Sequence, residues 1–360
     1  MKKVMTYAYT SFNLGDDLFL KILFERYPHT KFVLFANHEY KEIFKSLTNV
    51  EVISNNSLLM RGSNFIFRTL KKPVLIQRWI AKKCDLAVYI GGSLFIQSEN
   101  WELSLRKNKD LLIKRQPFFL LGANFGPFQD ETFYLEHKEL FKHYEDVCFR
   151  EKHSYTMFSD LENVRQADDI VFQLKRSSVG LSGNKIVISV IKPSVKENLK
   201  SYENIYYEKM SEISKHFIDQ GYRVTLMSFC KYEGDMEAIN KIIEKVPADY
   251  QKSIDQYVYE KNIDEALSVI ADSTFVVASR FHAMILGWVY NKPIFPIVYS
   301  TKMTNVMKDV GYSGGYSEFD QLINLKPEVV FENMSQELLR IEERQKTSAK
   351  HFKILDETLS

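Results

Sequence analysis

Cysteine is scarce in this 360-residue chain, which contains only Cys84, Cys148 and Cys230. The three lie far apart and form no C-x-x-C pair. A disulfide framework needs an even set of cysteines, and a structural zinc site needs closely spaced thiolates or imidazoles. The sequence therefore supports neither a disulfide framework nor a metal site, and it favours a reducing, cytoplasmic location.

Long apolar runs and an excess of one charge are also missing. No stretch approaches the roughly 18–20 apolar residues that a membrane span requires. Asp16 and Asp17 interrupt the N-terminus before the apolar part of a signal peptide can form. The net charge is +2, so bulk charge favours no nucleic-acid partner. We expect a soluble, cytoplasmic protein, which does not exclude the inner face of a membrane.

The glycines do not form the G-x-G-x-x-G pattern, so no dinucleotide cofactor is expected. Several of them instead follow apolar runs that are typical of strands: Gly15, Gly91, Gly92, Gly122 and Gly126. In parallel sheets ligands bind at the carboxyl ends of strands, where glycine lets the backbone approach a ligand closely. These glycines are therefore candidates for a binding rim, although each is equally explained by a tight turn.

Short apolar runs alternate with helix-like patterns, which is typical of parallel sheets covered by helices. In the first half we predict strands at 3–7, 31–35, 50–53, 86–90, 117–121 and 146–149. The pattern lapses over 173–184 and restarts with strands at 185–191, 223–229 and 274–278. We predict an α/β fold with two Rossmann-like domains facing a cleft (GT-B-like), at 1–175 and 183–335. A charged helix over 327–343 leads into a helical tail at 336–360.

Ser279-Arg280-Phe281-His282 is the most informative stretch, because it joins an apolar strand to a helix-like segment. The first N–H groups of a helix lack intrahelical partners and carry partial positive charge. A guanidinium can bind an anion bidentately, and an imidazole can transfer a proton near neutral pH. The junction therefore predicts a site that binds a small anion and transfers a proton. The simpler alternative is a capping serine, a surface arginine and a core histidine.

Other short blocks accompany this junction in a fixed order. Downstream lie Asn291-Lys292-Pro293, an apolar run, and Tyr299 followed by Lys302. Upstream lie Asn13-Leu14-Gly15-Asp16-Asp17, Ile90-Gly91-Gly92, Gly122-Ala123-Asn124-Phe125-Gly126-Pro127-Phe128, Arg150-Glu151 with Ser154, and Asp169 with Phe172. Over residues 1 to about 312 this order resembles the polysaccharide pyruvyl transferase family. The chain departs from that pattern in having Asp17 where glutamate is common.

The resemblance implies transfer of the pyruvyl unit of phosphoenolpyruvate onto a sugar as a cyclic ketal, in the synthesis of capsular, exo- or cell-wall polysaccharide. No metal or redox cofactor is then needed, and the acceptor would be a lipid-linked oligosaccharide. The catalytic residues expected are His282 as general acid, Arg280 and Asp17, while the identity of the general base stays open. The substrate-binding residues expected are Asn13, Gly15, Asp16, Gly91, Gly92, Asn124, Gly126, Arg150, Ser279 and Lys302.

Several of these residues have simpler explanations. Arg150 beside Glu151 also fits a surface ion pair, Asp16 or Asp17 a helix cap, and Lys302 a solvated side chain. Two other functions stay open as well: a GT-B glycosyltransferase that uses a nucleotide sugar, and a non-catalytic subunit that binds sugar phosphates. The absence of Asp and Glu from 291–301 counts against the glycosyltransferase, since such enzymes often bind ribose through a carboxylate there.

The segment 52–84 is rich in basic and large apolar residues and contains no Asp or Glu. Its basic residues are Arg61, Arg68, Lys71, Lys72, Arg78, Lys82 and Lys83. Such a mixture suits a surface that contacts anionic lipid headgroups. A core-packing helix with a basic outer face explains it equally well, whereas no nucleic-acid-binding module is recognisable. We therefore predict peripheral membrane contact through 52–84.

Overall fold

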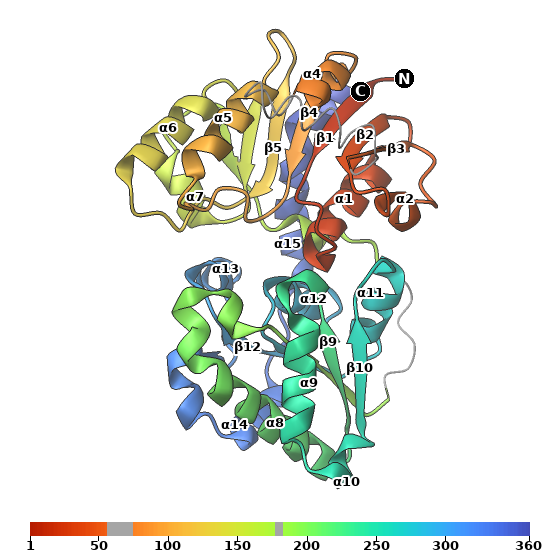
Figure 1. The fold of residues 1–360 in the computed structure, drawn as a ribbon, viewed down its shortest axis with the longest axis vertical. Helices are drawn as coiled ribbons and strands as arrows, with labels where there is room; N and C mark the ends of the chain where they lie inside the picture. Colours follow the sequence, from red (N-terminus) through yellow and green to blue (C-terminus); the bar gives the residue numbers. More distant parts are fainter. Residues whose placement is uncertain (56–74, 177–182) are drawn as a thin grey trace. The chain divides into compact units, whose positions relative to one another are not determined.

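A computed structural model describes residues 1–55, 75–176 and 183–360 of the chain. These residues form two compact units, each of which Figure 1 shows. The N-terminal unit consists of Met1–Thr10, Phe19–Ile170 and Lys346–Ser360. The C-terminal unit consists of Ser11–Leu18 and Val171–Gln345. A short N-terminal segment thus belongs to the C-terminal unit, and the C-terminal end belongs to the N-terminal unit.

The N-terminal unit is built on a parallel sheet. In its described part the strands follow the order β3-β2-β1-β4-β5-β6-β7. Their bounds are β1 Lys3–Tyr7, β2 Lys31–Ala36, β3 Val50–Ser54, β4 Leu86–Ile90, β5 Phe118–Ala123, β6 Asp146–Phe149 and β7 Val164–Gln166. The first six agree with the sequence prediction. Five of them are apolar runs that are largely buried, whereas β3 is half-buried at the edge of the sheet. Strand β7 was not predicted, since three residues are too short to show a pattern.

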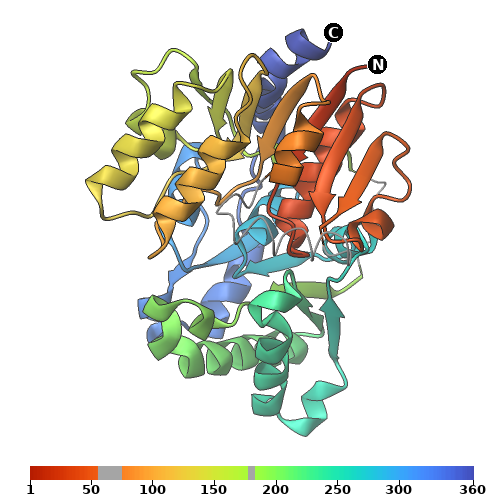
Figure 2. The ribbon, with the colours of Figure 1, turned by 45° about the horizontal axis from the view of Figure 1, so that its top comes forward.

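Helices cover both faces of this sheet. Figures 1 and 2 show α4, α5 and α6 on one face and the C-terminal helix on the other. The bounds are α1 Leu14–Arg26, α2 Tyr40–Ile43, α4 Leu75–Ala81, α5 Trp101–Leu111, α6 Glu131–Phe141, α7 Lys152–Met157 and α16 Lys353–Leu359. The core between α5, α6 and the sheet is largely aromatic, with Phe95, Phe125, Phe133 and Phe141 in contact with one another.

The C-terminal unit contains a second parallel sheet, whose described strands follow the order β10-β9-β8-β11-β12-β13. Their bounds are β8 Lys185–Ser189, β9 Arg223–Ser228, β10 Ile254–Val258, β11 Phe275–Ala278, β12 Ile294–Val298 and β13 Ser317–Glu318. Both sheets reverse their strand order once, as in doubly wound folds. The predicted α/β fold with two Rossmann-like halves is therefore confirmed. The edge strand β10 was not predicted, because Asp255 and Gln256 are exposed and interrupt its apolar pattern.

Helices follow the strands of the C-terminal unit, as the helix-like patterns between its apolar runs predict. Their bounds are α8 Glu203–Asp219, α9 Asp235–Lys245, α10 Ala248–Gln251, α11 Ile263–Ala271, α12 Phe281–Val289, α13 Thr301–Val310, α14 Pro327–Glu332 and α15 Ile341–Ser348. The single helix predicted over 327–343 is wrong. Asn333 ends α14, and its side chain instead donates to Ile294 O at 2.5 Å and accepts from Gly315 N at 2.7 Å.

The C-terminal residues do not form a separate tail over 336–360. Residues 346–360 pack in the N-terminal unit, where Phe352 and Leu355 are fully buried. Arg26 donates to both carboxylate oxygens of Asp356, at 3.0 and 2.6 Å. The sequence could not show this docking, because the polar pair that anchors it is separated by 330 residues. The change of unit falls after Ile170, a few residues before the predicted boundary at 175.

Part of the predicted basic segment 52–84 lies outside the described residues, including Arg61, Arg68, Lys71 and Lys72. Residues 177–182 of the predicted linker also lie outside them. Across the portions that the structure describes, none of the helices combines the length and apolar character needed to cross a bilayer.

Candidate active site

The predicted site residues follow strands at the positions where each sheet reverses its order. Doubly wound folds bind ligands at these switch points, beyond the carboxyl ends of the strands. In the N-terminal sheet the reversal lies between β1 and β4, and Gly91 and Gly92 directly follow β4. In the C-terminal sheet it lies between β8 and β11, and Ser279 and Arg280 directly follow β11.

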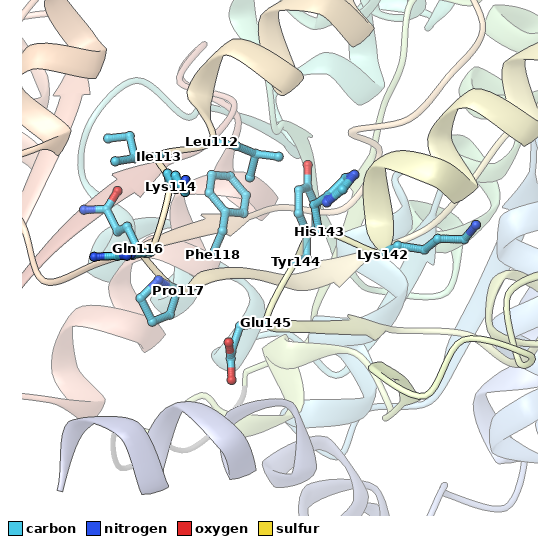
Figure 3. Close-up of a pocket in the computed structure, with 11 residues that line it drawn as sticks. Leu112, Ile113, Lys114, Gln116, Pro117, Phe118, Lys142, His143, Tyr144 and Glu145 are labelled. Atoms are coloured by element: carbon cyan, nitrogen blue, oxygen red, sulfur yellow. The ribbon is translucent and has the colours of Figure 1, made fainter.

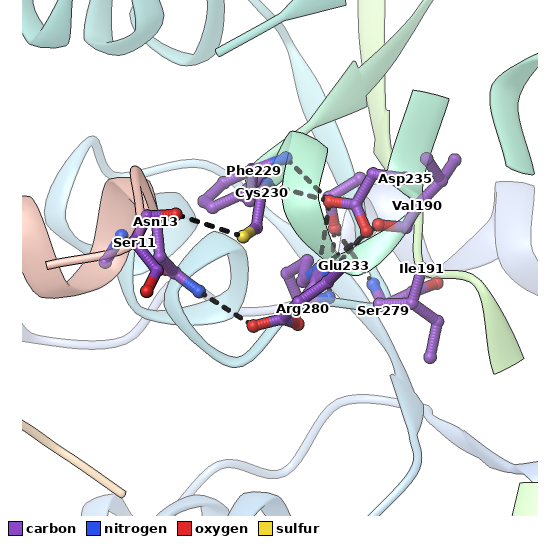
Figure 4. A network of polar contacts seen from close by, with 12 residues as sticks. Ser11, Asn13, Val190, Ile191, Phe229, Cys230, Glu233, Asp235, Ser279 and Arg280 are labelled. Atoms are coloured by element: carbon purple, nitrogen blue, oxygen red, sulfur yellow. Dashed lines mark hydrogen bonds and ion pairs between the residues drawn. The ribbon is translucent and has the colours of Figure 1, made fainter. Parts of the chain in front are cut away.

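The segment Ser11–Leu18 brings the Asn13-x-Gly15-Asp16-Asp17 block into the C-terminal unit. Leu14 N donates to Phe229 O at 3.0 Å, and Asn13 forms an antiparallel bridge with Cys230. Asn13 also shapes the turn itself, since its Oδ1 accepts from Gly15 N at 3.0 Å. The block thus forms the first turn of α1, and this helical turn is fixed to the end of β9 (Figure 4).

Gly15 lies against His282. A β-carbon at position 15 would fall on the imidazole, next to Nδ1. Only glycine leaves room for the ring there, because any larger residue would have to displace the imidazole or the turn. His282 is half-buried and stands in the first turn of α12. The sequence predicted both residues as parts of a site, and the structure brings them together.

Asp17 is fully buried beside Tyr259. The Tyr259 hydroxyl donates to Asp17 Oδ2 at 2.6 Å, and neither side chain reaches solvent. Its neighbour Asp16 is half-buried in the first turn of α1. Tyr259 was missed at the sequence level, because it lies 242 residues from its partner and belongs to none of the recognised blocks.

Arg280 is the N-terminal cap residue of α12 and is held by two carboxylates. Its Nε donates to Asp235 Oδ2 at 3.2 Å, its Nη2 contacts Asp235 Oδ1, and its Nη1 contacts Glu233 Oε2 (Figure 4). Asp235 also accepts from the backbone N–H groups of Phe229 and Cys230, both at 2.9 Å. Arg280 is therefore a buried, oriented cation rather than the surface arginine of the simpler sequence explanation.

The three charges of this cluster shift one another's pKa. Burial lowers the pKa of Arg280, but the two carboxylates outweigh it and raise that pKa above its usual value. Burial raises the pKa of Asp235 more than Arg280 lowers it. Glu233 is also desolvated, but the attraction of Arg280, with Lys196 and Lys302, lowers its pKa below the usual value. The arginine stays charged, and Glu233 holds its negative charge more firmly than Asp235.

Ser279, which directly follows β11, is held by two residues that were not predicted as parts of the site. Ser189 Oγ accepts from Ser279 N at 3.0 Å and from Arg280 N at 3.1 Å. The Tyr206 hydroxyl donates to Ser279 Oγ at 2.9 Å. Ser279 is fully buried. The buried Ser279 hydroxyl therefore helps to fix the junction between β11 and α12. Ser189 could have been found in the sequence as the serine that ends β8, the strand next to β11.

Lys302 belongs to a small cationic group around Tyr299. Its Nζ lies 5.4 Å from the centre of the Tyr299 ring and 5.5 Å from that of Phe281. Lys196 Nζ lies 5.1 Å from the same Tyr299 ring. Desolvation by the surrounding protein lowers the pKa of Lys196, and the positive charges of Lys302 and Arg280 lower it further. Lys196, also missed in the sequence, thus adds a third cation to Arg280 and Lys302.

The predicted residues of the N-terminal unit form a separate buried network. Arg150 Nη1 donates to Asp169 Oδ2 at 3.0 Å, and Nη2 donates to Asn124 Oδ1 at 2.7 Å. A β-carbon at Gly92 would lie 2.6–2.7 Å from the guanidinium. Arg150 is 3 % exposed, so the surface ion pair with Glu151 is excluded as its explanation.

The neighbouring blocks support this network. Asn124 N donates to Gly92 O at 2.9 Å, and Asn124 Nδ2 donates to Gly126 O at 3.4 Å. Ser154 Oγ accepts from Phe125 N at 2.8 Å and donates to Glu151 Oε1 at 2.6 Å. Gly91 lies directly before Gly92, at the end of β4. The blocks with Gly91, Asn124, Gly126 and Arg150 thus meet at one edge of the N-terminal sheet.

A cavity of about 530 Å³ lies at the other edge of the same sheet (Figure 3). It is bordered by Pro117 and Phe118 at the start of β5 and by Tyr144 and Glu145 just before β6. None of the predicted site residues lines it. Because ligands of doubly wound folds bind at the carboxyl ends of strands, it is not the candidate active site. In the described parts of the chain, His, Cys, Asp and Glu do not gather in groups of three that could hold a metal ion.

Comparisons with solved structures show which fold the two units make. The Anabaena protein Alr3699/HepE, solved with UDP-glucose, is 14 % identical, with a TM-score of 0.60 over 100 % of this chain and 98 % of that one. The UDP-GlcNAc 2-epimerase of Methanocaldococcus jannaschii is 10 % identical, with a TM-score of 0.61 over 99 % of this chain and 100 % of that one. At these identities the likeness shows the fold alone, which is that of the GT-B class.

Sequence comparisons agree with the blocks that meet in the two units. Amylovoran biosynthesis protein AmsJ of Erwinia amylovora is 23 % identical in an alignment 288 residues long, which covers 74 % of this chain and 69 % of AmsJ. The model of the polysaccharide pyruvyl transferase family matches residues 13–301, from Asn13 through the Ser279-to-His282 junction to Thr301. With its block order, its GT-B fold and this match over most of its length, the chain belongs to the polysaccharide pyruvyl transferase family.

Proposed function

We propose that this protein transfers the pyruvyl unit of phosphoenolpyruvate onto a sugar as a cyclic ketal. Membership of the family supports a transferase of polysaccharide biosynthesis. The observation that carries the proposal is the C-terminal unit's pairing of a half-buried imidazole with a cationic group. His282 lies against Gly15 and follows Arg280 by two residues. Lys302 Nζ lies 5.5 Å from the ring of Phe281, the residue between them, and shares the Tyr299 ring with Lys196.

The chemistry needs these two features together. Phosphoenolpyruvate carries a phosphate and a carboxylate, which cationic side chains can hold. A proton added to C3 breaks the C2–C3 double bond and makes C2 electrophilic. One sugar hydroxyl then attacks C2 and loses its proton. A second hydroxyl of the same sugar attacks C2, loses its proton, and displaces inorganic phosphate, which leaves the ketal.

We assign the proton transfer to C3 to His282, since an imidazole can donate a proton near neutral pH. Arg280, Lys196 and Lys302 would hold the anionic groups of phosphoenolpyruvate. Asp17 has no exposed surface and accepts a hydrogen bond from Tyr259. We therefore propose that Asp17 positions the turn carrying Gly15, rather than touching the substrate itself.

The N-terminal unit would supply the acceptor side. Gly91, Gly92, Asn124 and Gly126 lie at the carboxyl edge of its sheet, where doubly wound folds bind ligands. Arg150 is held internally by Asp169 and Asn124. We therefore propose that it fixes this edge instead of binding an anion.

A lipid-linked acceptor would require contact with a membrane, and helix α4 supports such a contact. Trp79 is 61 % exposed, and Lys83 Nζ lies 3.5 Å from the centre of its ring. An exposed indole beside lysines suits the headgroup region of an anionic bilayer. We expect the Lys82→Glu, Lys83→Glu double variant to sediment less with anionic liposomes than the parent protein does. Equal sedimentation of the parent with neutral and anionic liposomes would contradict this contact.

The proposed function is tested by incubating the protein with phosphoenolpyruvate and candidate lipid-linked oligosaccharides. We expect release of inorganic phosphate that depends on the acceptor, together with a mass gain of one pyruvyl unit on the sugar. A parallel incubation with nucleotide sugars distinguishes a pyruvyl transferase from a glycosyltransferase. Release of nucleoside diphosphate there, without phosphate release from phosphoenolpyruvate, would show a glycosyltransferase instead. The absence of turnover in both, with phosphoenolpyruvate still bound, would favour a non-catalytic subunit.

A further inference from the structure

The two carboxylates that hold Arg280 differ in how firmly they are fixed. The Asp235 side chain is fully buried and accepts two backbone N–H groups as well as the guanidinium. The Glu233 side chain is 30 % exposed. It stands at the end of a short turn, Lys231–Glu233, directly before Gly234, whose φ of 79° lies in the left-handed region. Asp235 is built into the fold, whereas Glu233 reaches the guanidinium from a surface turn.

The groups around the Glu233 carboxylate are those that an anionic substrate would need. Arg280 Nη1 contacts one of its oxygens, and Asn13 Nδ2 donates to the other at 3.4 Å (Figure 4). The positive charges of Lys196 and Lys302 also act on this carboxylate. Three residues that the sequence predicts for the site, Asn13, Arg280 and Lys302, thus converge on a negative charge that belongs to the protein itself.

We propose that Glu233 occupies the position of a substrate anion and must leave Arg280 before that anion can bind. This inference rests on the proposed function, because it makes Glu233 a specificity-determining residue of the same site. Asp235 would keep Arg280 oriented through Nε and Nη2, while Nη1 changes partner from Glu233 to the substrate. A ligand must then outcompete an internal carboxylate, which selects small anions of high charge, such as phosphoenolpyruvate, over neutral sugars.

Removing the charge of Glu233 should therefore strengthen anion binding. Glu233→Gln keeps the size of the side chain but removes the competing charge, so Arg280 no longer loses a charge-assisted hydrogen bond when a ligand enters. Such a bond corresponds to a factor of about ten or more in affinity. We expect calorimetry to show phosphoenolpyruvate and inorganic phosphate each binding about tenfold more tightly to Glu233→Gln than to the parent protein.

The matched control is Glu237→Gln. Glu237 lies in the first turn of α9, its side chain is 68 % exposed, and it pairs with Lys192. The loss of this charge four residues away should leave both affinities unchanged. An equal gain in both variants would mean that any lost negative charge strengthens anion binding, which would overturn the specific role of Glu233.

Unchanged or weaker binding of both anions to folded Glu233→Gln would also overturn the inference, because Glu233 would then support Arg280 instead of competing for it. Glu233→Ala is the second variant. If neither variant folds, Glu233 is structural and the inference fails. Inorganic phosphate separates this outcome from failure of the proposed function. If Glu233→Gln binds phosphate more tightly but the protein transfers no pyruvyl unit, Glu233 does compete with an anion for Arg280, and the proposed pyruvyl transfer is wrong.

Discussion

The imidazole of His282 fills the space in which a β-carbon of Gly15 would stand. The two residues are 267 positions apart in the sequence, yet the segment Ser11–Leu18, which includes the first turn of α1, belongs to the same compact unit as α12. The N-terminal block of the family therefore shapes the surroundings of the histidine that we propose as general acid. Gly15 is needed there because it leaves room for the His282 side chain, and not because its own backbone bends.

Gly15→Ala should accordingly impair catalysis about as much as His282→Ala does. A positioned general acid contributes roughly 10²–10⁴-fold to the rate, and a displaced imidazole loses that contribution. We expect kcat to fall by about this factor in both variants while phosphoenolpyruvate still binds. Gly183→Ala is the control, because a β-carbon there would meet no atom within 4 Å. A Gly15→Ala enzyme that keeps more than about a tenth of the parent's kcat would show that the imidazole can move without loss.

Arg150 should contribute to the stability of the N-terminal unit. Replacing it by methionine leaves the buried carboxylate of Asp169 without its cation, and breaking a buried pair in this way typically costs about 3–5 kcal/mol. We expect Arg150→Met to lower the free energy of unfolding in urea by that amount. Arg223→Met is the comparison, because the Arg223–Asp255 pair is nearly half exposed and should cost about 0–1 kcal/mol. Equal losses in the two variants would contradict a buried role for Arg150.

The sequence predicts those parts of the fold that depend on local pattern. Strands such as Leu86–Ile90 and Asp146–Phe149 are apolar runs bounded by turns, and they begin and end where predicted. Strand β10 was missed because an edge strand exposes polar residues, and the break in the helix predicted over 327–343 was missed because Asn333 bonds to residues distant in the sequence. The local sequence pattern therefore does not predict elements whose bounds depend on tertiary contacts.

The candidate site follows the same division. Its blocks are recognisable in the sequence, including Asn13, Gly15, Arg280 and His282. Their partners are not, because pairing depends on the fold: Arg280 meets Glu233 and Asp235, some 45 residues away. The sequence could therefore indicate a cationic junction, but not that an internal carboxylate already contacts its arginine.

Tyr259 should stabilise the first turn of α1, which carries Asp17. In Tyr259→Phe the carboxylate of Asp17 loses a hydrogen bond of 2.6 Å inside the protein, which typically costs about 1–3 kcal/mol. We expect a corresponding fall in the free energy of unfolding, measured in urea. Tyr257→Phe provides the matched control, since its hydroxyl makes a 3.4 Å hydrogen bond to Asn262 O in an exposed position. A loss no larger than that of Tyr257→Phe would argue against a structural role for the Tyr259–Asp17 pair.

His351 should make the stability of the protein depend on pH. This side chain is fully buried in the N-terminal unit. Burial, with the charge of Arg165 nearby, lowers its pKa from the usual 6.5 to about 3. Between these values the unfolded chain binds a proton that the folded protein does not. Stability from this group is therefore complete above about pH 6.5 and falls as the pH decreases towards 3.

From pH 7.5 to pH 5.0 this single group should remove about 2 kcal/mol from the free energy of unfolding. Urea titrations at the two pH values measure the loss in the parent protein. In His351→Leu the group is absent, so the difference between the two pH values should shrink by the same amount. His143→Leu is the control, because the His143 side chain is 64 % exposed and should leave the difference almost unchanged. If the parent and His351→Leu lose stability equally on acidification, His351 does not stay uncharged in the folded protein, and another group causes the loss.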